Sequence, residues 1–350
     1  MRDGGASSTG NPRGTAILRS RELASPLTGL ALGTGYGLLC RWVFDTEPEG
    51  DGIAIAFAGV SIAFLLLVPF GLGVLTAALA PPRERPPWLY WLLMPLVSAG
   101  LLLGASLLLA WEGAICIVMA APIVLTMALM GGLAVGLVTT NRGRRSVRPR
   151  AVAGCLVLPF LFAPFEAGLP RPQGLRDVTT RVEIAAAPEQ VWRELVRVPR
   201  ITDAEQTPGL FHAIGIPRPL EATLSHEGVG ALREAHFEGG LRFHERVTEW
   251  EPGRRLAFTI DIDPQTVSSA VLDRHVRVGG AIFDVTYGRF ELEPSPRGTR
   301  LHLHSQHRLS TTLNAYAGLW SDAVMQDIQR NICNVIRSRS ERARRVREES

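Results

Sequence analysis

The chain has 350 residues, a formal net charge of +4 and a hydrophobic fraction of 46%. All 37 basic residues are arginine, which is typical of a GC-rich genome. No arginine–aromatic pattern of a nucleic-acid-binding module is present, so we expect no nucleic-acid partner. The four cysteines form no CxxC pair, and the common nucleotide, zinc-protease and nucleophile-elbow motifs are missing, so we expect neither a metal nor a cofactor.

Residues 1–23 are polar and rich in glycine and serine. They lack a short apolar core followed by a small-residue cleavage site, which a secretory signal peptide requires. We therefore predict a flexible cytoplasmic N-terminus rather than a cleaved leader.

Residues 24–169 predict a membrane domain. A membrane-spanning helix needs about 20 mostly apolar residues. Five stretches are candidates, namely 24–44, 53–80, 88–110, 113–138 and 151–169. The fifth is the shortest in apolar length and contains Pro159 and Pro164, so it either spans the bilayer or is re-entrant. We predict an α-helical transmembrane bundle of about five spans in the inner or plasma membrane, with the lipid bilayer as its partner.

The arginines of the short loops predict the orientation. Four precede the first span, two lie in PPRERPP between the second and third spans, and five lie in NRGRRSVRPR after the fourth. Because cytoplasmic loops carry the excess of basic residues, the N-terminus is predicted to be cytoplasmic. Five spans then place the C-terminal domain outside the cytoplasm, and four spans place it inside.

No ionisable residue lies in the middle of a predicted span, since Arg41 and Glu112 are near span ends. Charged residues inside the membrane usually mark ion or substrate pathways. The sequence therefore favours a multi-span anchor over a proton-coupled transporter or pump.

After a linker at 170–177, the pattern becomes that of an α+β domain at 178–342, followed by a basic tail at 343–350, which we interpret as a solvated helix end. Strand-like runs occupy 178–185, 220–226, 230–238, 241–250, 254–262, 283–293 and 299–309. A short helix is predicted from Pro188, and a long one over 318–345 with Leu319, Ile328, Ile332, Val335 and Ile336 in one apolar stripe. One long helix covering a curved antiparallel sheet predicts an apolar cavity between them.

The stretch RVEIAAAPEQVWREL at 181–195 contains the run Ala187-Pro188-Glu189-Gln190-Val191-Trp192 between a strand and a helix. It resembles the opening signature of the SRPBCC superfamily, also called START-like or helix-grip, which includes polyketide cyclase/dehydrase and lipid-transport domains. The resemblance covers about 178–342 and implies a helix-grip fold that binds a hydrophobic ligand. The extended stretch 263–285, together with 314–320, departs from the common pattern and resembles membrane-attached bacterial members.

The run LHLHSQHRL at 301–309 brings three histidines together in one predicted strand. Side chains alternate between the two faces of a strand, so His302 and His304 share the outer face and His307 lies on the other with the leucines. Three ligands from this strand cannot converge on one ion, so we predict no metal site. His307 is instead a candidate polar group at one end of the cavity.

The remaining candidates for chemistry are His275, Asp284 and His307. His275 lies in the extended stretch, and a His–Asp pair can perform acid–base catalysis. The alternatives are a loop held by its own hydrogen bonds and a loop that gates the ligand. The candidate ligand-binding residues are Phe243, Phe258, Phe290, Trp320 and Tyr287.

From these observations we predict membrane-anchored binding or transfer of a hydrophobic small molecule of the lipid, isoprenoid or quinone class, and we expect a binding protein rather than an enzyme. Two alternatives stay open. One is an enzyme of the cyclase or hydrolase type acting on a hydrophobic substrate. The other is a partner-binding domain with a filled core and no ligand. The sequence does not indicate an oligomeric state.

Overall fold

A computed structural model describes residues 12–45, 61–80, 88–141, 147–207, 209–262 and 278–348. The described residues form two compact units. The first contains residues 12–45, 62–80, 88–109, 120–141 and 147–165, and the second contains residues 61, 110–119, 166–207, 209–262 and 278–348.

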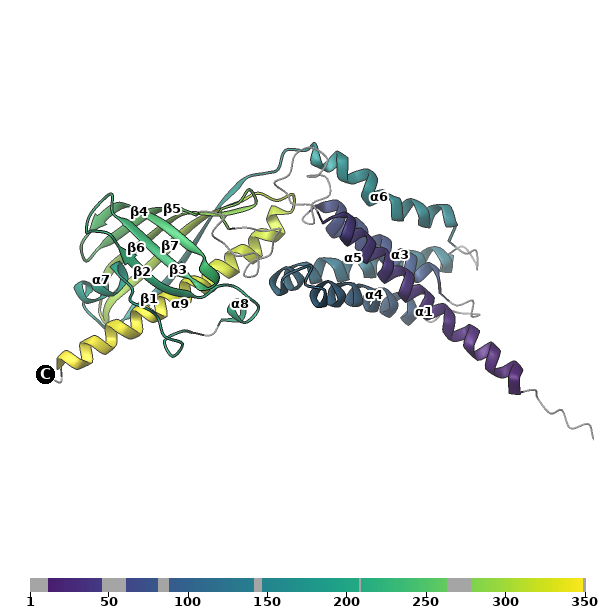
Figure 1. Ribbon diagram of the computed structural model, residues 1–350, viewed down its shortest axis with the longest axis horizontal. Helices are drawn as coiled ribbons and strands as arrows, with labels where there is room; N and C mark the ends of the chain where they lie inside the picture. The colour runs from purple at the N-terminus through teal and green to yellow at the C-terminus, as the bar shows by residue number, and fades with distance from the viewer. Residues whose placement is uncertain are drawn as a thin grey trace, which may run out of the picture. The chain divides into compact units, whose positions relative to one another are not determined.

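In the first half of the chain the described residues are almost all helical (Figure 1). They are α1 (Pro12–Val43), the π-helical turn η1 (Ala63–Leu67), α3 (Val68–Ala78), α4 (Trp88–Leu108), α5 (Ala114–Asn141) and α6 (Pro149–Ala167). Three segments, Trp88–Leu108, Ala114–Thr140 and Pro149–Ala167, are long and apolar enough to cross a membrane. Their length and composition are consistent with membrane association.

The other predicted spans are helical where they are described. Segment 24–44 falls almost wholly within α1, and the described part of 53–80 contains the shorter apolar helix Ala63–Ala78. Segment 151–169, which the sequence left as a span or a re-entrant segment, is helical to Ala167 through both of its internal prolines.

Close approach of these helices depends on glycine. A Cβ atom added at Gly73 of α3 would overlap the backbone carbonyl of Ala128 in α5, and one added at Gly33 of α1 would overlap the hydroxyl of Thr76 in α3. Small residues at such contacts let helix backbones pack tightly in an apolar phase, where burial from water cannot drive association.

The second half of the chain forms one antiparallel sheet and a long helix. The strands are β1 (Gly174–Ile184), β2 (Pro219–Leu224), β3 (Leu232–Phe237), β4 (Arg242–Glu251), β5 (Arg255–Asp261), β6 (Phe283–Ser295) and β7 (Gly298–Leu309), in the spatial order β1-β7-β6-β5-β4-β3-β2. The helices are α7 (Pro188–Val196), α8 (Leu210–Ala213) and α9 (Asn314–Glu348), with the 3₁₀ turn η2 at Glu238–Gly240. The predicted sheet and C-terminal helix are confirmed.

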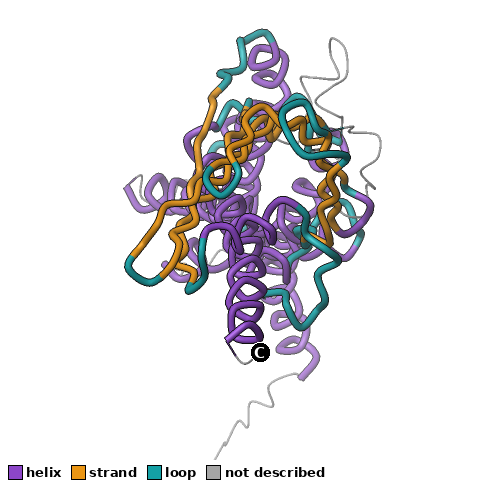
Figure 2. Tube along the Cα trace, turned by 90° about the vertical axis from the view of Figure 1, so that its left-hand side faces the viewer, coloured by secondary structure: helices purple, strands orange, loops and turns teal. Residues whose placement is uncertain are grey.

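The sheet curves into a half-barrel around α9. Figure 2 shows the strands arching over the helix, which runs down the view toward the C-terminus. Burial alternates along β7, with Leu301, Leu303, Ser305, His307 and Leu309 facing inward as predicted.

The inward side of α9 carries Ser321, Met325, Gln329, Cys333 and Ile336, spaced three or four residues apart. The predicted stripe was wrong at Leu319, which is 67% exposed. Leu319 lies two residues before Ser321, and two residues turn the side chain by about 200° around a helix of 3.6 residues per turn.

Candidate functional site

Two clusters of buried apolar side chains fill the interior between the sheet and α9. In the cluster beside α7, Leu256, Leu301 and Ile336 are almost fully buried, and the partly buried side chains around it include Ile260. Ile328, which borders the second cluster, also packs against Phe211 and Ile216. The partly buried apolar side chains around the second cluster are Phe243, Ile260, Phe283 and Ile328. We call these four residues the apolar mouth.

Two of the predicted ligand-binding phenylalanines belong to the cluster beside α7. Phe258 and Phe290 are each 3% exposed, and their ring centroids lie 6.1 Å apart. The guanidinium carbon of Arg233 lies 5.6 Å from the Phe258 ring and 5.9 Å from the Phe290 ring, within cation–π range. These two rings therefore serve as core around a buried cation.

Arg233 forms a buried ion pair with Glu245, which faces it across the β3–β4 hairpin. Arg233 also donates to the carbonyls of Val196 at 3.3 Å and Leu195 at 3.4 Å. Burial raises the pKa of the Glu245 carboxyl above its ordinary value, and the Arg233 guanidinium opposes that rise. The sequence analysis missed this pair, although both residues stand at inward positions of alternating strands.

His307 is fully buried. Its Nε2 lies 3.0 Å from the hydroxyl of Ser321 on α9 and 3.7 Å from Oδ1 of Asp322, and its ring centroid lies 5.3 Å from that of Phe283. Burial lowers the pKa of His307 from its ordinary value, while the nearby carboxylate of Asp322 raises it. A neutral imidazole thus faces the interior beside the apolar mouth.

Asp322 is itself held from β1. Arg176 donates to its two carboxylate oxygens at 2.8 and 2.5 Å, and this ion pair ties the first turns of α9 to the edge of the sheet.

A polar seam continues from there along the same interface. Gln329 accepts from the hydroxyl of Thr180 at 2.8 Å and donates to the carbonyl of Val178 and the hydroxyl of Ser305, both at 3.0 Å. These bonds fix α9 against β1 and β7.

Asp284 does not meet His307. In the β6–β7 register Asp284 lies opposite Arg308, 3.6 Å from its guanidinium, whereas Val285 lies opposite His307. Neighbouring positions of a strand point to opposite faces, so the two side chains are on opposite sides of the sheet. Burial raises the pKa of Asp284. His275 lies outside the described residues, and its pairing with Asp284 stays a prediction.

The other three predicted ligand-binding residues lie in separate places. Phe243 is part of the apolar mouth, with its ring 4.8 Å from that of Phe237. Trp320 packs edge-on against Phe211 at 6.5 Å, near α8. Tyr287 lies on the outer face of the sheet, 6.2 Å from the ring of His304.

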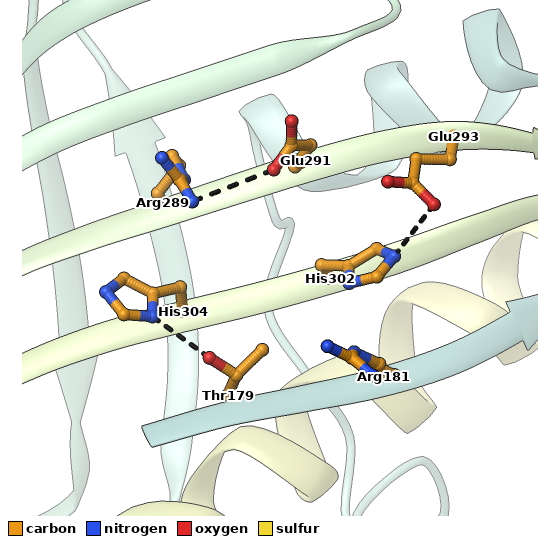
Figure 3. A pocket seen from close by; sticks show the side chains of 7 residues that line it. All are labelled: Thr179, Arg181, Arg289, Glu291, Glu293, His302 and His304. Carbon is orange, nitrogen blue, oxygen red and sulfur yellow. Dashed lines mark hydrogen bonds and ion pairs between the residues drawn. The ribbon is translucent and has the colours of Figure 1, made fainter. Parts of the chain in front are cut away.

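A second concave surface lies on the outer face (Figure 3). This groove has a volume of about 270 Å³ and is lined by Thr179, Arg181, Arg289, Glu291, Glu293, His302 and His304. His304 is 3.0 Å from the Thr179 hydroxyl, and His302 is 3.2 Å from Glu293. Opposite charges pair across the strands here, so the groove is polar where the interior is apolar. Among the described residues, no group of three or more His, Cys, Asp or Glu side chains is arranged to hold a metal ion.

No protein-family model matches the chain, and no curated protein matches it. Solved structures similar to it include the Zhui aromatase/cyclase from Streptomyces sp. R1128, at 16% identity and a TM-score of 0.30, with 49% of this chain and 96% of that chain covered. An uncharacterized protein from Rhizobium leguminosarum matches at 14% identity and a TM-score of 0.30, covering 50% and 99%. A protein from Thermus thermophilus matches at 18% identity and a TM-score of 0.31, covering 48% and 99%.

Proposed function

We propose that the second unit binds an apolar small molecule between its sheet and α9, in a protein anchored to a membrane by its helices. The observation that carries the proposal is the apolar mouth. Phe243, Ile260, Phe283 and Ile328 pack against the interior cluster, yet each is only partly buried in the described part of the chain. Covering apolar surface contributes about 25 cal/mol per Å², so an apolar ligand gains free energy by doing so.

The polar groups of the interior support the same function. Ligand pockets are mostly apolar, with a few polar groups that fix the orientation of the ligand. Next to Phe283 of the mouth stand the imidazole of His307 and the hydroxyl of Ser321. The carboxylate of Asp322, which pairs with Arg176, lies 3.7 Å from the imidazole.

The apolar helices of the first unit support membrane anchoring. Three of them are long and apolar enough to span a bilayer. A bilayer concentrates lipids, isoprenoids and quinones, so a binding site carried on the same chain is supplied from that store. We propose binding or transfer of a ligand of this kind. Of the candidate catalytic residues, Asp284 and His307 lie on opposite faces of the sheet and do not form an acid–base pair.

Photolabelling of the full chain in lipid nanodiscs tests this proposal. A dodecane that carries a diazirine is activated by light, and the labelled residues are mapped by mass spectrometry. We expect labels on the apolar mouth, because an apolar probe gains most where inward surface is left uncovered. Labels confined to α4, α5 and α6 would contradict the proposal, because the probe would then report only the bilayer.

Two tryptophan substitutions on one helix provide the matched control. Ile328→Trp fills the mouth and is expected to lower labelling of Phe243 and Phe283 at least fivefold. Leu319→Trp adds the same side chain at an exposed position of α9 and is expected to leave that labelling unchanged. Equal effects of the two variants would also count against an interior site.

A further inference from the structure

His307 contains a buried hydrogen-bonding atom without a partner. The ring is fully buried, and no donor among the described residues lies within hydrogen-bond distance of Nδ1. Buried polar atoms in folded proteins are nearly always paired, and one left unpaired costs free energy. A role of Nδ1 in binding a ligand would explain why the fold retains an unpaired atom at this cost in free energy.

The contacts of the other ring nitrogen decide what Nδ1 offers. With the single proton of the Ser321 hydroxyl donated to the carbonyl of Gly318 at 3.2 Å, its oxygen accepts from Nε2–H of His307 at 3.0 Å. The Asp322 carboxylate, 3.7 Å from Nε2, favours the same tautomer. Burial also keeps the imidazole neutral by lowering its pKa. A neutral imidazole with its proton on Nε2 presents a lone pair at Nδ1, which accepts a hydrogen bond and cannot donate one.

The surroundings of the ring connect it to the proposed ligand. The ring of Phe283, a residue of the apolar mouth, lies 5.3 Å from the His307 ring, and both side chains face inward from neighbouring strands. His307 is fully buried, so a molecule held in the mouth would reach the imidazole by displacing the side chain of Phe283, which is only partly buried. The two ring nitrogens point in divergent directions, and only Nε2 is engaged by α9.

We propose that Nδ1 of His307 accepts a hydrogen bond from a hydroxyl group of the apolar ligand, so that the site selects alcohols and phenols over hydrocarbons, ethers and esters. This inference rests on the proposed function and narrows its ligand class. A hydroxyl supplies the donor that Nδ1 lacks, whereas an ether or ester oxygen only accepts and would leave the atom unpaired.

The test uses the full chain in nanodiscs and the photoreactive dodecane of the previous experiment. Dodecan-1-ol and its methyl ether, 1-methoxydodecane, compete with the probe for labelling of the mouth. Because the two compounds partition differently into the disc lipids, the quantity compared is the ratio of their half-effective concentrations in each variant. We expect His307→Phe to reduce the preference for the alcohol by about five- to tenfold relative to the wild type, as expected for one neutral hydrogen bond.

Two further variants make the result specific. His307→Asn keeps an acceptor oxygen near the position of Nδ1 and is expected to retain most of the preference for the alcohol. His304→Phe makes the same change as His307→Phe on the same strand but on the outer face, and it is expected to behave as the wild type. Loss of the preference in His304→Phe would overturn the assignment to His307.

The outcomes separate this inference from the function on which it rests. If the mouth is not labelled in the wild type, the proposed function fails. If it is labelled but wild type and His307→Phe give the same ratio, the hydroxyl proposal alone is overturned. If His307→Phe does not fold, nitrogen-15 NMR of histidine-labelled wild-type protein replaces it. The Nδ1 resonance of His307 is then expected to move with dodecan-1-ol and not with its ether, and a resonance unmoved by the alcohol would refute the proposal.

Discussion

Glu205 and Arg339 join a loop before β2 to the outer part of α9 by one ion pair. The Arg339 guanidinium donates to the two carboxylate oxygens at 2.8 and 3.0 Å and also reaches the carbonyls of Pro199 and Arg200. This bidentate contact holds the pKa of Glu205 at about 2, below its ordinary value of 4.5. The folded state therefore binds a proton at Glu205 less readily than the unfolded chain does.

The sign of the pH dependence follows. The stabilisation is fully present above about pH 4.5 and is lost as the pH falls towards 2. We expect Glu205→Gln to lower the free energy of unfolding by about 1–3 kcal/mol at pH 7 and to match the wild type near pH 2. Thermal unfolding of the full chain, followed at the β-sheet infrared band, measures this.

Glu227→Gln is the control for that measurement, because Glu227 pairs with Arg197 at 3.5 Å on an exposed surface. Its effect is expected to stay below about 0.5 kcal/mol. If Glu205→Gln lowers the free energy of unfolding by the same amount at pH 7 and at pH 2, then packing and not charge stabilises the loop.

Tyr287 illustrates a limit of reading single residues from the sequence. Strict alternation from Phe283 and Val285 places Tyr287 on the inward face, which fits a ligand-binding residue. The strand register shifts between Val285 and Tyr287, so one extra residue turns Tyr287 outward, opposite Gln306. No turn residue marks the bulge at Thr286, and the alternation alone gives no sign of it.

Helix packing in the first unit depends on where each glycine faces. Gly73 of α3 meets the backbone of α5 at Ala128, whereas no atom outside α4 comes within 4 Å of a Cβ added at Gly104. We expect Gly73→Ala to lower the stability of the full chain by about 1–3 kcal/mol, because a backbone cannot give way as a side chain can. Gly104→Ala is expected to be neutral or slightly stabilising.

Thermal unfolding of the full chain in nanodiscs, followed by the helical circular dichroism signal, compares these two variants. Equal stability of the two would mean that α3 and α5 do not approach each other at Gly73.

The elements of the sheet domain were predictable because each depends on local pattern. Alternation in β7 correctly separated His302 and His304 from His307, and the helical spacing after residue 318 identified α9. The pairings inside the domain were not predictable. Arg176 and Asp322 are 146 residues apart, and Ser321 meets His307 only because of the rotation of α9 about its own axis. Spacing along one element does not specify how it is rotated against another.

The orientation of the whole molecule in the membrane is a prediction that reporter fusions decide. Five spans place the end of the chain outside the cytoplasm, because the arginine-rich loops fix the N-terminus inside. We therefore expect alkaline phosphatase fused after Ser350 to be active and a green fluorescent protein at the same place to be dark. The same reporters fused after Arg85, in a loop predicted to be cytoplasmic, are expected to give the reverse result. A fluorescent fusion at Ser350 would mean that the segment 151–169 does not cross.

The polar seam at Gln329 restricts how the second unit could accommodate the proposed ligand. Moving α9 along its axis by one turn, about 5.4 Å, would break all three hydrogen bonds of Gln329. It would leave buried groups of Val178, Thr180 and Ser305 without these partners. The hydrogen bonds of Gln329 therefore oppose sliding of α9 along its axis. On the proposed function, room for a ligand would come from side-chain rotations at the mouth. We therefore expect the site to select its ligand by size and to exchange it without large rearrangement of the backbone.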